Sequence, residues 1–504
     1  MKTFMKKILS RRLLFILSLV ATIFFGFVMF ELQILPLKYY IPLMIVLLIF
    51  VVSLYFGEKD KHDRHPVRVT FLKLVNIILA VALVFGGLSG MKGSDLLAAI
   101  TGGGDQTVEM DVVVLKSSAF ESLKDLKGKP FGGNTAMDAI NVNKCETIIE
   151  DEIGNIDVTQ LTTYANVISA LEKNQISAMI VKAVDLESFD DIEKGFNEKI
   201  KIIKKIDIKI PSVSANSAKV TKEPFHILIS GTDKEGPIGT FALSDVNMIA
   251  TINPVTKQVF LTSIPRDYFV DIVGMDGVSG KDKLTHSAKG GMQCTIQTIE
   301  NFMGIKFNYY AKFNFTSFMN VVDALGGITV NVPKYRVVGR DDGVFVTKKG
   351  KYTIKPGENH FNAKQALSFV RERKAFVEGD TIRGKNQMLM LKAILKKCTS
   401  ATIITKMDGV FESLKDSFET NMTSQEIKSL INMQVDDMSS WDVQSYHLDG
   451  DPSQRTKTLA TVGDVTKVNP NGMFITIPDQ TSIDQAKQYI QSVMNGEIIK
   501  VKDE

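Results

Sequence analysis

The chain begins with three long apolar segments that contain no charged residue, over residues 13–30, 39–56 and 74–91. Each is near the lower end of the roughly 17–25 residues that a helix needs to cross the hydrocarbon core of a bilayer. A cleaved signal peptide would explain only the first segment. The pattern therefore predicts a membrane anchor over residues 1–91 with three transmembrane helices.

Charges beside these segments predict which side of the membrane each loop occupies. The loop between the first two segments carries only Glu31 and Lys38. Cations gather instead before the first segment and between the second and third, at Lys2, Lys6, Lys7, Arg11, Arg12, Lys59, Lys61, Arg64, Arg68 and Lys73. Because cytoplasmic loops are enriched in Lys and Arg, the N-terminus and residues 57–73 are expected inside, and everything after Met91 outside.

A small α/β accessory domain is predicted over residues 108–210, after a linker over residues 92–107 that is rich in Gly, Ser and Asp. Apolar strand patterns at 109–115 and 176–181 enclose helical patterns at 135–153 and 164–173. The stretch SLKDLKGKPFG (Ser122–Gly132) resembles segments of extracytoplasmic solute-binding lobes. A ligand-binding domain and a spacer without a ligand both remain open for this part.

A larger α/β domain is predicted over residues 224–480, after a second linker over 211–223 that is rich in Ser, Ala and Lys. Helical patterns end before Gly304 and at Gly326-Gly327, which is typical of helix C-termini. Residues 481–504, which are polar and amphipathic, are expected to form a C-terminal tail. The predicted strands are 225–230, 246–252, 258–264 and 328–332, and the predicted helices are 293–303, 316–325, 363–369 and 384–397.

Composition excludes several classes of protein. Hydrophobic residues make up 44% and charged residues 23% of the chain, which is globular rather than disordered. The net charge of +4 is too balanced for an obligate nucleic-acid binder. The three cysteines exclude a disulfide scaffold and a four-cysteine zinc site. The sequence also lacks a GxxxxGK[ST] phosphate loop, an HExxH zinc motif and a GxSxG elbow, so ATP-driven chemistry and serine or zinc hydrolysis are disfavoured.

Two aspartates follow or begin neighbouring predicted strands of the larger domain. Asp233 comes after the strand 225–230 through the turn Ser230-Gly231-Thr232, and Asp245 stands at the start of the next strand. Carboxylates at adjacent strand ends can hold a divalent cation through oxygen ligands. The alternative is that each aspartate caps a turn.

Arginines stand at the ends of other predicted elements. Arg266 follows an apolar strand in SIPRD, and Arg383 and Gln387 are spaced to share one face near the N-terminus of the helix 384–397, where anions are favoured. Arg371 and Arg373 alternate in VRERK. Together with the aspartates, these groups predict a site for a pyrophosphate and a metal ion.

The geometry of VRERK (Val370–Lys374) decides whether both of its arginines can reach one ligand. If the segment is extended, Arg371 and Arg373 face the pocket together and Glu372 faces away. If the helix predicted before it continues, the two arginines diverge by about 200°. We expect the segment VRERK to be extended.

Five segments together resemble the catalytic domain of the LytR–CpsA–Psr family. They are HILISGTD (226–233), SDVNMIATINPVTKQVFLTSIPRD (244–267), GIKFNYYAKFNFTSFMNVVDALGGITVNVP (304–333), NAKQALSFVRERK (362–374) and GDTIRGKNQ (379–387). Three N-terminal spans and an accessory domain are similar to the capsule-associated branch of that family. The resemblance implies an α/β catalytic domain with a central mixed sheet.

That family consists of membrane-anchored extracytoplasmic phosphotransferases. The resemblance implies that this chain moves a glycopolymer, of capsular polysaccharide or teichoic acid type, from a polyprenyl-pyrophosphate carrier to peptidoglycan at the cell membrane of a Gram-positive bacterium. It implies the lipid bilayer and capsule assembly proteins as further partners, and no nucleic acid. By the same resemblance, Mg²⁺ or Mn²⁺ would be held by Asp233 and Asp245. The pyrophosphate would be bound by Arg266, Arg371, Arg373, Arg383 and Gln387, and the catalytic residues would be Arg266, Arg371, Arg373 and Asp245.

The chain departs from the family pattern at Leu243, where the family often has an arginine, so one charge at the pyrophosphate is missing. The general base is open between Asp245 and Asp267, because a nearby metal ion lowers the basicity of a carboxylate. Two other functions compete with transfer. One is a non-enzymatic membrane regulator or attenuator of capsule or cell-envelope expression, although the inner segments 1–12 and 57–73 are too short for a DNA-binding fold. The other is a sensor acting through residues 108–210.

Overall fold

The computed structural model describes residues 10–33, 35–58, 66–101, 106–210, 213–232, 238, 242–275, 277–400, 407–415, 417–464 and 471–501. The chain forms two compact units. The first comprises Met1–Thr101, Lys397–Lys415 and Thr423–Ser440, and the second Gly102–Lys396, Asp416–Met422 and Trp441–Glu504.

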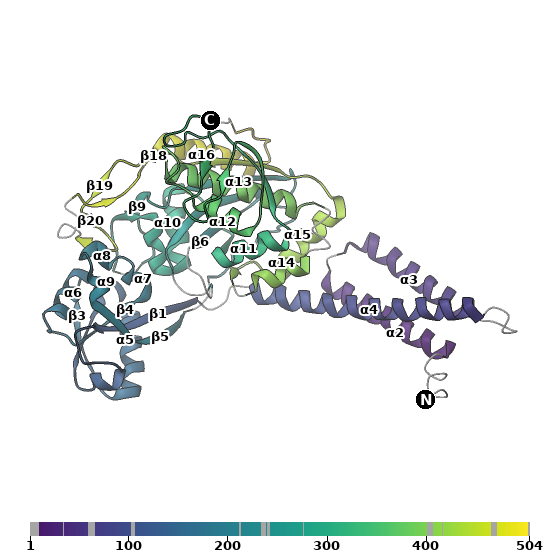
Figure 1. Ribbon diagram of the computed structural model, residues 1–504, viewed down its shortest axis with the longest axis horizontal. Coiled ribbons are helices and arrows are strands. Elements are labelled where there is room, and N and C mark those ends of the chain that lie inside the picture. Colours follow the sequence, from purple (N-terminus) through teal and green to yellow (C-terminus); the bar gives the residue numbers. More distant parts are fainter. Residues whose placement is uncertain are drawn as a thin grey trace. The chain divides into compact units, whose positions relative to one another are not determined.

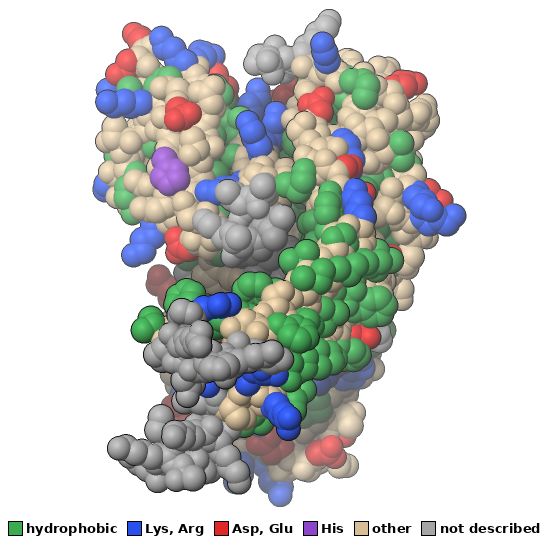
Figure 2. All heavy atoms as spheres, turned by 90° about the vertical axis from the view of Figure 1, so that its right-hand side faces the viewer, with side chains coloured by type: hydrophobic (Ala, Val, Ile, Leu, Met, Phe, Trp, Pro, Cys, Tyr) green, Lys and Arg blue, Asp and Glu red, His purple; other side chains and the backbone are tan. Residues whose placement is uncertain are grey.

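The first unit contains the three N-terminal helices predicted from the apolar segments, α2 (Arg11–Leu32), α3 (Leu37–Gly57) and α4 (Pro66–Ile100). They run side by side, and each is long and apolar enough to cross a membrane (Figure 1). Hydrophobic side chains gather on the outer face of these helices, as expected for contact with lipid (Figure 2). The helix α4 continues past the predicted end of the third span, so residues 92–100 are helical and not a linker.

Two later helices belong to the same unit as the membrane helices. They are α14 (Met407–Leu414), which packs against α4, and α15 (Ser424–Asp437). Exposed salt bridges connect both to the membrane helices, from Lys92 to Glu412 at 3.0 Å and from Lys38 to Asp436 at 2.7 Å. The helices α14 and α15 therefore belong with the membrane anchor, although the sequence placed them within the larger domain, and β16 (Phe418–Thr420) between them belongs to the second unit.

The accessory domain in the second unit has a five-stranded sheet in the order β3-β2-β4-β1-β5. Its strand β2 is parallel to β3 and β4, whereas β1 is antiparallel to β4 and β5. The strands are β1 (Gln106–Leu115), β2 (Pro130–Asn134), β3 (Asp157–Leu161), β4 (Ala178–Lys182) and β5 (Ile200–Ile210). The helices are η1 (Leu123–Leu126), α5 (Thr135–Ile153), α6 (Tyr164–Glu172), α7 (Ala183–Leu186), α8 (Phe189–Ile192) and α9 (Phe196–Lys199).

The larger domain is built on a six-stranded mixed sheet in the order β16-β11-β6-β7-β8-β17, as the resemblance implied. The pairs β11–β6 and β8–β17 are parallel, and the other neighbours are antiparallel. The strands are β6 (Phe225–Thr232), β7 (Ser244–Asn253), β8 (Gln258–Ile264), β11 (Tyr309–Asn314), β16 (Phe418–Thr420) and β17 (Asp442–His447). The strand β8 is buried along its whole length, because helices cover both faces of the sheet.

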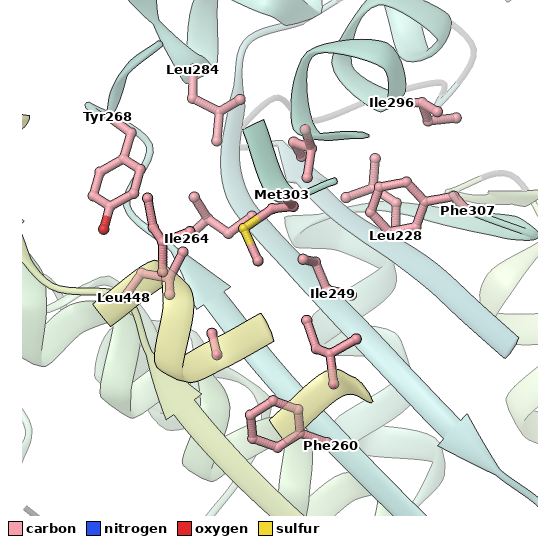
Figure 3. Close-up of a cluster of buried hydrophobic side chains, with 14 of the residues drawn as sticks. Leu228, Ile249, Phe260, Ile264, Tyr268, Leu284, Ile296, Met303, Phe307 and Leu448 are labelled. Atoms are coloured by element: carbon pink, nitrogen blue, oxygen red, sulfur yellow. The ribbon is translucent and has the colours of Figure 1, made fainter. Parts of the chain in front are cut away.

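One face of this sheet packs against α10 (Gly291–Met303) and α16 (Gln480–Met494). Leu228, Ile249 and Phe260 of the central strands meet Ile296 and Met303 in this core (Figure 3). The same core buries Ile483, Ala486, Ile490 and Val493 of α16. The prediction of a C-terminal tail over residues 481–504 is therefore wrong, since most of that segment is an amphipathic helix of the domain core.

The opposite face of the sheet is covered by α11 (Phe315–Ala324), α12 (Ala363–Arg371) and α13 (Asp380–Cys398). Leu391 and Leu395 of α13 pack against Val259 and Leu261 of β8. This face holds the candidate site. The remaining elements are β9 (Phe269–Asp271), β10 (Lys281–Lys283), η2 (Leu284–Gly290), β12 (Ile328–Val332), β13 (Phe345–Val346), β14 (Thr353–Ile354), β15 (Gly357–Phe361), β18 (Gly450–Asp451), β19 (Arg455–Thr456), β20 (Thr458–Leu459), β21 (Gly463–Asp464), β22 (Met473–Phe474) and β23 (Ile477–Pro478).

Candidate active site

A cavity of about 370 Å³ lies between the sheet and the helices α11, α12 and α13, and its lining is divided by chemistry. The predicted polar residues that line it are Asp245, Arg266, Arg371, Arg373, Arg383 and Gln387. The apolar residues that line it are Ile229, Val246, Met248, Phe313, Phe315, Phe318, Val370, Leu391 and Ile394. The structure thus brings together all the residues predicted for pyrophosphate binding and Asp245 of the predicted metal pair, whereas Asp233 lies outside the described residues and the candidate base Asp267 does not line this cavity. A cavity with this lining suits an amphiphile with an anionic head.

Arg266 is held at the cavity by two carboxylates. Its Nη1 lies 2.5 Å from Oδ1 of Asp245, and its Nε lies 3.6 Å from Oδ2 of Asp267. Burial would lower the pKa of Arg266, but the two carboxylates outweigh burial and raise that pKa above its ordinary value. The Nε atom is buried and has no hydrogen-bond partner among the described residues, so it remains free to donate to a ligand oxygen.

Arg383 is the most deeply buried cation of the site. Its Nη2 donates to Oδ2 of Asp380 at 2.9 Å. The pKa of Arg383 is lowered, chiefly by burial, and the nearby cations Arg266 and Arg373 add to this effect while Asp380 opposes it. Cations that lower the pKa of the buried Arg383 favour an anionic ligand, because its negative charge would relieve the repulsion between them.

The segment VRERK changes conformation between its two arginines. The helix α12 begins with a capping box at Asn362 and ends at Arg371, and Glu372 is extended with φ −72° and ψ 129°. The guanidinium of Arg371 lies over the ring of Phe315, with Cζ 4.2 Å from the ring centroid. Because the helix stops here, Arg373 returns to the same cavity. Both arginines line it, although only the second half of the segment is extended.

Glu372 does not face away from the site, contrary to the sequence-based expectation. It is buried, and its Oε1 accepts the backbone N–H groups of Arg373, Lys374 and Ala375 at 3.1, 2.8 and 3.0 Å. Its Oε2 accepts the backbone N–H of Lys348 at 2.5 Å. Because the Glu372 carboxylate accepts four backbone N–H groups, it fixes the loop that carries Arg373. It also joins this loop to the turn between β13 and β14.

Three lysines and one aspartate belong to the site but were not predicted. Lys348, Lys349 and Lys374 line the cavity with the arginines, and the neighbouring ammonium of Lys348 lowers the pKa of Lys374. Asp380 pairs with Arg383 and lies 3.9 Å from Nη1 of Arg373. The sequence KKGK over residues 348–351 resembles a solvated loop, whereas Asp380 could have been found from its place three residues before Arg383.

Three further predicted positions have defined surroundings. Gln387 lies one turn after Arg383 on α13, and its Nε2 donates to the backbone oxygen of Val370 at 3.4 Å. Asp267, a candidate base, has its Oδ1 3.2 Å from Nζ of Lys283. Leu243, where the family often has an arginine, packs against the core of the accessory domain. An interdomain apolar contact therefore occupies the position where the family pattern has a charge.

A mixed sheet with a cavity lined by both arginines and apolar side chains is suited to an amphiphile with an anionic head. A profile of the LytR_cpsA_psr family matches residues 189–490, and the chain belongs to this family. It is 33% identical over 277 residues to the polyisoprenyl-teichoic acid–peptidoglycan teichoic acid transferase TagU of Bacillus licheniformis, covering 54% of this chain and 79% of that relative. It is 29% identical over 312 residues to the transferase TagV of Bacillus subtilis, covering 62% and 71%. The crystal structure of Bacillus subtilis TagV is 28% identical, covers 54% of this chain and 98% of that chain, and has a TM-score of 0.43.

Proposed function

We propose that this protein is a membrane-anchored transferase that moves a glycopolymer from a polyprenyl-pyrophosphate carrier onto peptidoglycan outside the cytoplasm. The names of its relatives support this class, since each names a transfer of teichoic acid from a polyisoprenyl carrier to peptidoglycan. The observation that carries the proposal is one cavity lined both by four arginines and by apolar side chains. A pyrophosphate head matches the arginines, and a hydrocarbon tail matches the apolar side chains.

The arginines supply the main catalytic effect. In the transfer, an acceptor hydroxyl displaces polyprenyl phosphate, and negative charge develops on the leaving phosphate. Arg266, Arg371, Arg373 and Arg383 are positioned to bind the pyrophosphate oxygens, and fixed cations in a buried site stabilise developing charge without reorganisation. Each charge-assisted contact contributes about 1.5–3 kcal/mol. The apolar lining excludes water, which would otherwise compete as the acceptor.

A divalent cation held by Asp245 and Asp233 is part of the proposal. Among the described residues, no group of three or more His, Cys, Asp or Glu could hold a metal ion. Mg²⁺ in phosphoryl-transfer sites is commonly held by one or two carboxylates together with the substrate phosphates, and Asp245 at the cavity fits that pattern. The strand register pairs Thr232 with Ser244, the sequence neighbours of the two aspartates. When bound, Mg²⁺ or Mn²⁺ would neutralise charge on the pyrophosphate.

Charge asymmetry around the membrane helices supports the extracytoplasmic placement. The loops predicted inside are basic, and α4 leads from the second of them to the accessory domain. The donor lipid and peptidoglycan both belong to that side of the membrane. Whether the glycopolymer is of capsular or teichoic acid type, and whether capsule assembly proteins take part, are finer parts of the same proposal.

The test is transfer of a labelled glycan from a polyprenyl-pyrophosphate donor to peptidoglycan by the full-length protein in detergent. Arg371→Ala and Arg373→Ala should each lower the rate ten- to a hundredfold, as expected from the loss of one charge-assisted contact. Arg371→Lys should not restore it, because an ammonium lacks the two-pronged guanidinium. Arg340→Ala, an exposed arginine outside the cavity, is the control. EDTA should abolish transfer, and Mg²⁺ or Mn²⁺ should restore it. Wild-type protein that neither binds the donor nor transfers the glycan would refute the proposal.

A further inference from the structure

The backbone that carries Arg266 is held from two sides, and the first side is η2. We call residues 266–269 the Arg266 segment. The backbone oxygen of Arg266 accepts the N–H of Thr285 at 2.9 Å, and the backbone oxygen of Tyr268 accepts the N–H of Leu284 at 2.8 Å. Because Leu284 and Thr285 begin η2, the position of η2 decides where this side of the segment lies.

The second side is formed by Thr476, which follows β22. Its N–H donates to the backbone oxygen of Asp267 at 2.8 Å, and its backbone oxygen accepts the N–H of Phe269 at 2.9 Å. Consecutive residues of the Arg266 segment are therefore bonded alternately to η2 and to Thr476. Since a buried backbone group that loses its partner costs free energy, the segment follows these two neighbours when they shift.

The helix η2 is anchored in the accessory domain. Its Lys289 is almost fully buried, and Nζ of this residue lies 3.1 Å from Oδ1 of Asp185 and donates to Oγ of Ser188 at 2.9 Å. The backbone oxygen of Lys289 accepts a hydrogen bond from Nζ of Lys182 at 3.4 Å. All three partners belong to the accessory domain, so η2 connects that domain to the Arg266 segment.

The segment that carries Thr476 is anchored in the accessory domain as well. We call residues 455–464 and 471–476 the arm. Four apolar side chains of the arm are buried in a core whose other buried members all belong to the accessory domain, and they are Leu459, Val462, Met473 and Ile475. Phe269 of the Arg266 segment packs against the same core. Met473 and Ile475 alternate with Phe474 and Thr476, which line a cavity of the catalytic domain, so this strand joins the two domains.

Asp282 joins the arm to η2. Its side chain is fully buried, and its Oδ2 accepts the backbone N–H of Thr461 in the arm at 2.8 Å. Its Oδ1 lies 2.7 Å from Nδ1 of His286 in η2. The two supports of the Arg266 segment are therefore bonded to each other as well as to the accessory domain, and we expect them to move together.

We infer that the accessory domain is a positioning element of the active site, which holds the backbone of Arg266 through η2 and the arm and thereby sets the affinity for the pyrophosphate of the donor. This inference rests on the proposed function for the role of Arg266. A spacer would not need contacts on both sides of a segment that binds substrate. The domain is thus part of the support of the arginine cavity.

Two leucines of the accessory domain form a matched pair for the test. Leu171 lies in the core shared with the arm, and its helix α6 packs against β21 of the arm. Leu126 lies in the second core of the same domain, which contains no described residue of the arm. Both side chains are buried, so replacement by alanine leaves a cavity in either core. Only the cavity at Leu171 adjoins the support of Arg266.

The first measurement is the affinity of the full-length protein in detergent for a labelled polyprenyl-pyrophosphate donor. Leu171→Ala should weaken donor binding about two- to thirtyfold, the range that remote residues of a coupled network produce. Leu126→Ala should lower the melting temperature similarly and leave donor affinity unchanged. Equal donor affinities in the two variants would overturn the inference, because a general loss of stability would then explain any effect.

A double-mutant cycle tests whether the effect passes through Arg266. Arg266→Ala should itself weaken donor binding. In that background Leu171→Ala should have no further effect, because the group that it displaces is already gone. A fully additive loss in the double variant would mean that the accessory domain affects donor binding by another route, and would contradict the inference.

Hydrogen exchange gives a readout that does not depend on the donor. The backbone N–H groups that hold the Arg266 segment should exchange faster in Leu171→Ala than in the wild type, and at the wild-type rate in Leu126→Ala. They are those of Phe269, Leu284, Thr285 and Thr476. If exchange responds in this way but the wild type binds no donor, the proposed function fails while the positioning of Arg266 stands. If exchange is alike in both variants, the accessory domain does not hold the segment.

Discussion

Glu372 is the residue whose surroundings differ most from the expectation based on alternation. A strand-like VRERK places it opposite the two arginines, so its replacement would be mild. In the structure its carboxylate instead accepts four backbone N–H groups from two loops. Such a residue organises the site without touching the reacting atoms, because it fixes the backbone that carries Arg373 and Lys348.

Glu372→Gln should therefore impair transfer strongly, at least tenfold. The amide offers one acceptor oxygen, and its NH₂ group meets a backbone donor, which leaves a buried N–H without a partner at a cost of about 1–3 kcal/mol. Transfer rates and donor affinity of the variant should fall together. Glu358→Gln, an exposed glutamate of β15, is the matched control and should behave as wild type. Normal transfer by Glu372→Gln would show that the loop does not depend on this carboxylate.

Asp138 gives the accessory domain a pH-dependent stability. Burial raises the pKa of Asp138 from the ordinary 3.8 to about 6, and the neighbouring carboxylate of Asp185 raises it further. Lys182, 3.0 Å away, and Asn141 lower this pKa but do not cancel the effect of burial. Between these two pH values the folded chain holds a proton that the unfolded chain has lost. Unfolding then releases a proton, so this residue makes stability fall as the pH rises from about 4 to 6.

The comparison of wild type with Asp138→Asn isolates this contribution, because other carboxylates titrate alike in both proteins. Thermal unfolding of the full chain in detergent should show the wild type losing stability relative to the variant as the pH rises through this window. A constant difference between the two proteins across the window would mean that Asp138 has the same pKa in both states.

At the scale of elements, a buried ion pair joins the accessory domain to the catalytic domain. Lys289 of η2 is almost fully buried, and its Nζ lies 3.1 Å from Asp185 and donates to Ser188 at 2.9 Å. Asp185, in α7, also accepts a hydrogen bond from Tyr164. Because η2 follows directly on Lys283, which contacts Asp267, this junction lies close in sequence to a candidate base of the site.

Lys289→Met should destabilise the chain by about 3–5 kcal/mol, because it leaves the carboxylate of Asp185 buried without its cation. The matched control is Lys199→Met, which removes an exposed pair with Glu172 and should cost about 0–1 kcal/mol. Denaturant unfolding in detergent measures both. Equal small effects would mean that the junction is hydrated and carries little energy.

The helices and strands of the catalytic domain were predictable where the period of the apolar residues agrees with the residues that end helices and strands. The strands β6, β7 and β8 and the helices α10 and α13 fall close to their predicted ranges, because Gly, Pro and Asn mark their ends. The helix α16 was not predicted as part of the domain, although its residues are amphipathic in sequence, because it is rich in Gln and other polar residues. Its apolar stripe, which includes Ile483 and Ile490, packs against the sheet. The continuation of α4 was missed because polar residues after Met91 end an apolar run without ending a helix.

The candidate site was predictable to the extent that its residues stand at element ends. Strand order brings Asp245 and Arg266 together, and both follow or begin apolar strands. Lys348 reaches the cavity from a distant hairpin, and Glu372 acts through its contact with that hairpin. Contacts between segments far apart in sequence leave no local pattern, so these residues could only be found in the folded chain.

At the scale of the whole molecule, the orientation of the anchor decides which substrates the catalytic domain can meet. The helix α4 is a single helix from Pro66 to Ile100, so its two ends belong to opposite sides of the bilayer if it spans it. The basic loop before it and the basic N-terminus should both lie inside. The accessory and catalytic domains, which follow α4, should then lie outside with the lipid-linked donor and peptidoglycan.

A reporter enzyme that is active only outside the cytoplasm tests this orientation. Fused after Gly103, it should be active, since the chain has crossed the membrane three times by that point. Fused after Lys61, in the loop between the second and third spans, the same reporter should be inactive, and it serves as the control. The reverse result would place the arginine cavity in the cytoplasm, where peptidoglycan is absent, and would exclude the proposed transfer whatever the cavity binds.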